Sequence, residues 1–85
     1  MSRIEIEYCG ACRIGSKAVT TRRTLLSWLR ERPDVDHEDV TLRPSSEEDV
    51  FCVSVDGKRV WCANDPERRV DAVAAVNAVR RQLAG

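Results

Sequence analysis

Apolar and acidic residues alternate near the start of the chain. Apolar side chains stand at even positions and acidic ones at odd positions in the run Ile4, Glu5, Ile6, Glu7 and Tyr8. Because successive side chains of a strand point to opposite faces, this period of two predicts a half-buried strand over 4–8. One side of the strand is expected to face a core and the other to face water.

The next segment changes to a helical period. Side chains that suit a core recur every three or four residues; they are Ile14, Ala18, Thr21, Leu25 and Leu29, flanked by Leu26 and Trp28. This stripe predicts an amphipathic helix over about 11–32. Pro33 disfavours helical geometry in the residue before it and is expected to end the helix. Gly15 lies in the first turns, where it costs up to about 1 kcal/mol relative to Ala.

A short strand is expected after this helix. A polar connection is predicted over 34–38, where the side chain of His37 should be solvated. Apolar and polar residues then alternate over 39–43, which predicts a strand. The following residues, 44–48, have the composition of a loop.

A β-hairpin is predicted next. Phe51, Val53 and Val55 alternate with Cys52 and Ser54, Asp56-Gly57 follows, and 58–62 is predicted to be the returning strand. This dipeptide is the strongest short signal for a hairpin.

The register of this hairpin decides where two cysteines lie. With a two-residue loop and no irregularity, Phe51 is opposite Cys62 and both face the core. Cys52 and Trp61 then lie on the other face. We therefore expect that Cys52 and Cys62 do not bond with each other, that Cys62 fills the core, and that Cys52 is a spectator or a regulatory thiol.

A second helix is predicted at the end of the chain. Asp65 is a favourable N-cap, Pro66 suits the first helical position, and Glu67 complements the positive end of the helix dipole. The apolar stripe consists of Val73, Val76, Val79 and Leu83, widened by Ala72 and Ala75.

The predicted order is therefore strand, helix, three strands and helix. A parallel crossover through the first helix is right-handed, which places that helix on one face of the sheet, and the second helix is expected on the same face. The fold class is thus α/β (α+β), with a mixed four-stranded sheet covered on one face and open on the other. The 85 residues leave room for one domain, over 1–85.

Composition narrows the function classes. Lys and Arg together number 14 and so do Asp and Glu, a balance that argues against general nucleic-acid binding. No apolar run is long enough to span a membrane, and no leader pattern opens the chain, so we expect a cytoplasmic protein. Because cytoplasm keeps thiols reduced, the four cysteines are not expected to form a two-disulfide framework.

The candidate chemistry lies in Cys9-Gly10-Ala11-Cys12, at the predicted junction of strand and helix. Unpaired backbone N–H groups at a helix N-terminus stabilise a thiolate there. Gly10 and Ala11 leave the sulfurs sterically open, and Arg13 adds positive charge nearby. One thiolate can attack a disulfide and the second thiol can resolve the mixed disulfide, so Cys9 and Cys12 are the predicted catalytic, redox-active pair. The protein is thus a candidate thiol–disulfide oxidoreductase.

Two other functions remain open. The first is binding or delivery of a soft metal, Cu or Zn, by the C-x-x-C pair. A zinc site needs four ligands, however, and the spacing of Cys52 and Cys62 is not the usual one. Copper chaperones place C-x-x-C similarly but end on a strand. The second is a non-catalytic interaction module that uses Trp61 on the open sheet face, where this side chain either packs under partial cover or binds a partner.

Two motifs together resemble a known family. Tyr8-Cys9-Gly10-Ala11-Cys12 resembles the redox motif of the selenoprotein W-like, thioredoxin-like Rdx family, in which the second cysteine position holds selenocysteine. The run from Val50 to Trp61 is similar to that family's hairpin, V-F-x-V-x-V-D-G-x-x-V/I-W. The resemblance covers nearly the whole chain. It departs at the segment after Cys62, which lacks the Gly-rich, Phe-containing stretch frequent in the family, and at the acidic run 47–49, where glycines are frequent.

The resemblance implies a minimal thioredoxin-like fold and a redox role. We expect neither a cofactor nor a resident metal. The partners that the resemblance implies are low-molecular-weight thiols such as glutathione, or protein thiols and disulfides. Selenium at the second position hints that Cys12 is more reactive than Cys9. Gly10, Ala11, Arg13 and Trp61 are the candidate partner-binding residues. A monomer or weak homodimer is expected, without nucleic-acid or membrane partners.

Overall fold

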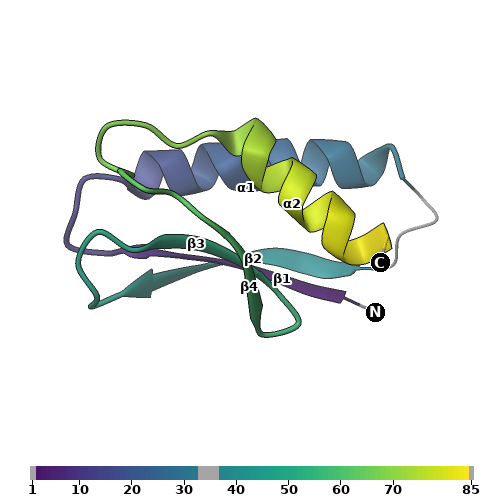
Figure 1. The fold of residues 1–85 in the computed structure, drawn as a ribbon, viewed down its shortest axis with the longest axis horizontal. Coiled ribbons are helices and arrows are strands. Elements are labelled where there is room, and N and C mark those ends of the chain that lie inside the picture. Colours follow the sequence, from purple (N-terminus) through teal and green to yellow (C-terminus); the bar gives the residue numbers. More distant parts are fainter. Residues whose placement is uncertain (1, 33–36, 85) are drawn as a thin grey trace.

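The computed structural model describes residues 2–32 and 37–84, without the side chains of 37–39 (Figure 1). Most of the connection expected over 34–38, and the side chain of His37, lie outside these residues. The elements in order are β1 (Ser2–Cys9), α1 (Gly15–Arg30), β2 (His37–Ser45), β3 (Phe51–Val55), β4 (Lys58–Cys62) and α2 (Ala72–Ala84).

The four strands form one sheet in the order β2-β1-β3-β4. β1 runs parallel to β2 and antiparallel to β3, and β3 runs antiparallel to β4. Figure 1 shows both helices on the same side of this sheet. The predicted fold class is therefore confirmed: an α+β fold with a mixed four-stranded sheet, covered on one face. The uncovered side is called the open face below.

The core lies between the sheet and the helices. Register along β1 sets Ile4 opposite Val55 and Ile6 opposite Val53, and all four side chains are buried. The predicted stripe of α1 packs against them: Ile14, Ala18, Thr21, Leu25 and Leu29 are each at most about 2% exposed. The helical period of the sequence therefore identified the buried side of α1 correctly.

α1 begins later than the sequence predicted, at Gly15 instead of about residue 11. The backbone N–H of Cys9 donates to Val50 O (2.9 Å) and that of Gly10 donates to Ser45 O (3.0 Å). These bonds hold the chain against the neighbouring strands, and residues 10–14 form turns before the helix starts. The C-x-x-C motif therefore precedes the first helical turn and is not part of it.

β2 is longer than predicted and includes Pro44, which was expected in a loop. Pro44 lies opposite Tyr8 in the parallel pairing with β1. β2 is an edge strand, where the missing N–H of a proline can face away from the sheet at no cost in hydrogen bonds. A proline therefore does not end this strand.

α2 also begins later than predicted, at Ala72. Its cap is Asp71, whose Oδ1 accepts a hydrogen bond from the N–H of Ala74 (3.1 Å). Asp65 instead starts a separate turn, in which its carbonyl accepts from the N–H of Arg69 (2.9 Å). Val73 points to solvent and is 65% exposed, contrary to its expected place in the apolar stripe, because the buried side of α2 is formed by Ala75, Ala78 and Val79.

The hairpin contains an irregularity that the alternation of its residues does not predict. Asp56 and Gly57 have φ of 52° and 85°, as a tight hairpin turn requires. Between Val53 and Ser54 the pairing with β4 shifts by one residue, so that Val60 is left over as a bulge. Beyond the bulge, the side chains of Trp61 and Cys62 each lie on the face opposite to the one predicted.

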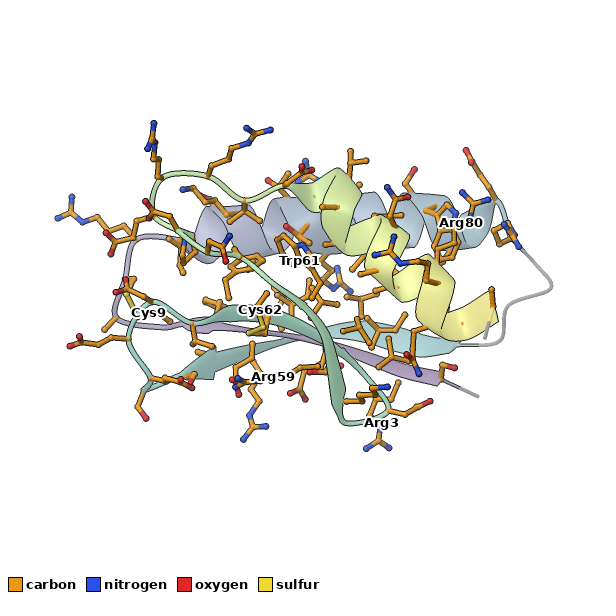
Figure 2. The ribbon with its side chains drawn as sticks, in the orientation of Figure 1. Arg3, Cys9, Arg59, Trp61, Cys62 and Arg80 are labelled. Carbon is orange, nitrogen blue, oxygen red and sulfur yellow. A yellow bond between two sulfur atoms is a disulfide. The ribbon has the colours of Figure 1, made fainter. Side chains whose placement is uncertain are left out.

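This bulge places Trp61 on the covered face, opposite Val53. There its ring meets the ring of Phe51 edge to face, with 6.3 Å between centroids (Figure 2). The expectation that Trp61 lies on the open face was therefore wrong. The hypothesis of an interaction module that binds a partner through Trp61 on the open face therefore loses its key residue.

Within the described residues, neither helix is both long and apolar enough to cross a membrane.

Candidate thiol–disulfide site

Cys9 and Cys12 form a disulfide where β1 ends, with 5.3 Å between their Cα atoms. Cys9 is the last residue of β1, and its backbone is fixed by the bond to Val50 O described above. In Figure 2 Cys9 lies at one end of the sheet, at the turn that leads to α1. The two predicted redox cysteines are therefore within bonding reach of each other.

The residues between the two cysteines are open to solvent. Gly10 and Ala11 are exposed, as is Arg13 just beyond. A Cβ on Gly10 would lie 3.1 Å from the Cβ of Pro44, which belongs to a rigid ring on β2. Glycine at this position therefore avoids a tight contact between the motif and β2. At Gly15 the nearest side-chain atom to an added Cβ is in the Tyr8 ring at 3.9 Å, an ordinary contact.

The two sulfur-bearing residues differ in exposure. Cys9 is 1% exposed and belongs to the buried core, whereas Cys12 is half-buried. Because α1 begins only at Gly15, the unpaired N–H groups of its first turn are farther along the chain from the cysteines than predicted. The difference between Cys9 and Cys12 therefore comes from their burial more than from their distance to the helix N-terminus.

Two carboxylates lie beside Cys12. The sulfur of Cys12 and carboxylate oxygens of Asp49 and Glu67 all fall within 4.8 Å of one another. Asp49 sits at φ 57° in the loop before β3, and Glu67 lies in the segment before α2. Negative charge at this distance disfavours a thiolate on Cys12. The acidic run 47–49 was visible in the sequence, but its position against Cys12 was not.

Lys17 holds the backbone at Glu67 in place. Its ammonium group donates to the carbonyl oxygens of Pro66 and Glu67, both at 2.6 Å. Pro66 is buried, so this segment is fixed against the start of α1. The first turn of α1 thus positions the segment that carries the Glu67 side chain.

The same three side chains are the one group in the described part of the chain with the spacing of a metal site. They offer one sulfur and two carboxylate oxygens, and the sulfur is in a disulfide. Soft ions such as Cu(I) prefer several thiolates, and structural zinc prefers four N or S ligands. The donor set therefore does not match the soft-metal site considered from the sequence.

The other two cysteines also form a disulfide, contrary to the sequence prediction. The bulge at Val60 sets Cys62 directly opposite Cys52, with 4.1 Å between their Cα atoms. Cys62 is exposed and does not fill the core, while Cys52 is 4% exposed. Register alternation places this pair on the open face, with Glu7 opposite Cys52 on β1.

The open face around this second pair is charged. Arg59 Nη2 lies 2.7 Å from Glu7 Oε1, and Arg43 Nη1 lies 3.4 Å from Glu5 Oε1. A shallow depression of about 590 Å³ follows these side chains across the sheet. Figure 2 shows Arg3 and Arg59 pointing away from the helices on this side.

A four-stranded mixed sheet with both helices on one face, and a C-x-x-C disulfide where the first strand ends, define a minimal thioredoxin-like α+β protein. A family model matches residues 3–81, and the chain belongs to the Rdx family.

Two solved structures are similar to this chain. A crystal structure of a protein from Bordetella parapertussis is 27% identical, with 96% of this chain and 98% of that one covered and a TM-score of 0.76. A selenoprotein W-related protein from Vibrio cholerae is 23% identical, with 96% of each chain covered and a TM-score of 0.75. The search of curated proteins gave no match. The resemblance to selenoprotein W-like proteins inferred from the sequence is therefore confirmed.

Proposed function

We propose that the protein is a thiol–disulfide redox protein whose Cys9–Cys12 pair alternates between dithiol and disulfide. The observation that supports this most is the bonding contact between the two cysteines at the end of β1, in a chain of the Rdx family. Substrates are small thiols and their disulfides, or cysteines of partner proteins.

Burial supports a defined order of attack. A partner must bring a sulfur to one member of the pair, and Cys12 is half-buried where Cys9 is 1% exposed. In the dithiol state, the Cys12 thiolate attacks a substrate disulfide and forms a mixed disulfide. The thiol of Cys9 then loses its proton and attacks Cys12 Sγ, which releases the reduced substrate and leaves the Cys9–Cys12 disulfide.

The carboxylates beside Cys12 adjust its reactivity. Asp49 and Glu67 disfavour a standing thiolate at Cys12, so the dithiol form reacts more slowly with adventitious oxidants than an isolated low-pKa thiol would.

Redox titration of a protein that lacks the second pair tests the function. The Cys52→Ser/Cys62→Ser variant is equilibrated in glutathione buffers of increasing reduced-to-oxidised ratio, quenched with acid, alkylated and analysed by mass spectrometry. We expect Cys9 and Cys12 to pass together from disulfide to fully alkylated across the series. Persistent thiols in oxidising buffer, or a bond that survives every reducing buffer, would refute the proposal.

The order of attack needs single variants. Cys9→Ser retains Cys12 alone, and Cys12→Ser retains Cys9 alone. We expect Cys12 to capture glutathione from oxidised glutathione at least about tenfold faster than Cys9, because thiol reactivity follows exposure. Equal rates, or faster capture by Cys9, would reverse the assigned roles.

A further inference from the structure

The second disulfide, Cys52–Cys62, joins the two strands of the hairpin and has no part in the chemistry proposed for Cys9 and Cys12. We propose that Cys52–Cys62 is a second thiol–disulfide site, reduced and re-formed by a small zwitterionic thiol that binds beside Cys62. The proposal does not depend on the function of Cys9–Cys12, because it concerns other sulfurs on other strands.

Exposure decides which sulfur is attacked. β4 is an edge strand of the sheet, and Cys62 is the last residue of that strand. Cys62 is exposed, whereas Cys52 on the inner strand β3 is 4% exposed. An incoming thiolate therefore approaches the pair from the side of Cys62, and Cys52 is the leaving group.

A cavity of about 510 Å³ adjoins Cys62, within the size range of small-molecule sites. It lies between the end of β4 and the segment before α2, and Arg68 and Arg69 line it. Neither guanidinium forms an ion pair with a side chain in the part of the chain that the structure describes. Guanidinium groups bind carboxylates in bidentate geometry, so a thiol that carries carboxylates fits these two arginines.

The cavity also contains negative charge, since Asp65 and Asp71 line it as well. Asp71 is already engaged as the cap of α2. Asp65 is exposed, and no side-chain hydrogen bond is found for it among the described residues, which leaves its carboxylate to meet an ammonium group. A cavity with both signs of charge suits a thiol of the glutathione class, with its two carboxylates and one ammonium, better than a neutral thiol.

The hairpin is held in place without the disulfide. The turn at Asp56-Gly57, the bond from Ala63 N–H to Phe51 O (2.9 Å) and the contact between Phe51 and Trp61 all remain when the two sulfurs separate. Reduction therefore leaves Cys52 and Cys62 opposite each other, and the bond can form again.

The exchange is balanced by two molecules of the small thiol. The first, as a thiolate, bonds to Cys62 Sγ while the Cys52–Cys62 bond breaks, and Cys52 leaves as a thiolate that takes up a proton. The second attacks the sulfur of the first, which frees the Cys62 thiolate and gives the small-molecule disulfide. The protein disulfide gains two electrons, and the two small thiols lose them.

The experiment uses the Cys9→Ser/Cys12→Ser variant, in which Cys52–Cys62 is the remaining pair. It is mixed with reduced glutathione, quenched with acid at intervals, alkylated and mapped by mass spectrometry. We expect the Cys52–Cys62 bond to be lost and to re-form in oxidised glutathione, with the mixed disulfide found on Cys62. A Cys52–Cys62 bond that opens only after denaturation would show that this disulfide is purely structural. Thiols of Cys52 and Cys62 that never pair would show that there is no second redox site. Either result overturns the proposal.

The binding of a charged thiol is tested by rate ratios. In the same background, Arg68→Gln/Arg69→Gln should lower the rate with glutathione relative to that with neutral 2-mercaptoethanol by about threefold to tenfold. Arg80→Gln removes an exposed guanidinium on α2 and should leave the ratio unchanged (Figure 2). An unchanged ratio in the double variant would refute recognition of the thiol's charge. Because the Cys52→Ser/Cys62→Ser variant tests the first pair separately, the two proposals can fail independently.

Discussion

The cysteines of the two disulfides are brought together by different kinds of structure. Cys9 and Cys12 are separated by three positions in sequence and meet in the turn that follows β1. Cys52 and Cys62 are separated by ten positions and meet because one extra residue in an edge strand shifts the pairing of β4. The first pair depends on local backbone geometry, whereas the second depends on tertiary packing that selects the register of the hairpin.

The surroundings of the two pairs differ in charge as well. Carboxylates of Asp49 and Glu67 lie beside Cys12, whereas guanidinium groups of Arg68 and Arg69 line the cavity next to Cys62. In both pairs one cysteine is buried and its partner is more exposed. The same chemical unit therefore has two acidic neighbours at the first pair and both acidic and basic neighbours at the second. Substitutions that affect one pair and spare the other test this contrast.

The largest effect is expected from Trp61→Ala. Removing this half-buried indole from its contact with Phe51 should lower the free energy of unfolding by about 2–3 kcal/mol, somewhat less than for a fully buried aromatic. Without the indole on the covered face, the bulged register loses its main support. Denaturant unfolding and disulfide mapping should show that the Cys52–Cys62 bond forms less completely, while Cys9–Cys12 still forms.

A matched control for this change is Trp28→Ala, which removes the other tryptophan, also half-buried, from α1. It should destabilise the protein but leave both disulfides in place. If the two variants affect the Cys52–Cys62 bond equally, the link between Trp61 and the register is wrong.

A smaller effect is expected from Gly10→Ala. The added Cβ would lie 3.1 Å from the Cβ of Pro44, so β2 or the motif must shift. We expect a loss of about 1 kcal/mol in the free energy of unfolding and slower closure of the Cys9–Cys12 bond, with Cys52–Cys62 unaffected.

Gly15→Ala is the matched control. An added Cβ there meets only an ordinary contact with Tyr8, and Ala is the better helix former, so unfolding should require up to about 1 kcal/mol more. Denaturant unfolding of both variants, with the rate of disulfide closure, measures the difference. Equal destabilisation by the two changes would contradict the steric role given to Gly10.

The sequence predicted those features that depend on local periodicity. The order of the elements, the buried stripe of α1 and the turn at Asp56-Gly57 follow from patterns within a few residues. The proximity of Cys9 and Cys12 was also predicted, because both cysteines belong to one short motif. Their geometry needs no distant partner.

The remaining features depend on contacts between segments far apart in the chain. The bulge at Val60 cannot be inferred from alternation alone. It moves the indole of Trp61 onto the covered face. Burial of a large aromatic side chain there outweighs the loss of one strand pairing. The starts of both helices were misplaced for a similar reason. Bonds from Cys9 and Gly10 to other strands delay α1, and Asp71 instead of Asp65 caps α2.

The smallest effect is expected from removing the charges beside Cys12. In a Cys9→Ser background, Asp49→Asn/Glu67→Gln should raise the rate at which iodoacetamide alkylates Cys12 by about threefold to tenfold at neutral pH, because fewer negative charges oppose the thiolate. Glu48→Gln changes an exposed acid in the same loop and should have little effect. A rate that stays the same in the double variant would show that these carboxylates do not influence the sulfur.

Disulfide mapping of the unaltered protein tests whether Cys9–Cys12 is a reversible redox pair separate from Cys52–Cys62. The native protein is equilibrated over a series of glutathione buffers, quenched with acid, alkylated, digested and analysed by mass spectrometry. We expect Cys9 to pair only with Cys12 and Cys52 only with Cys62, with the Cys9–Cys12 bond opening and closing reversibly within the series. Bonds between the two pairs, or a Cys9–Cys12 pair that never forms in oxidising buffer, would contradict this expectation.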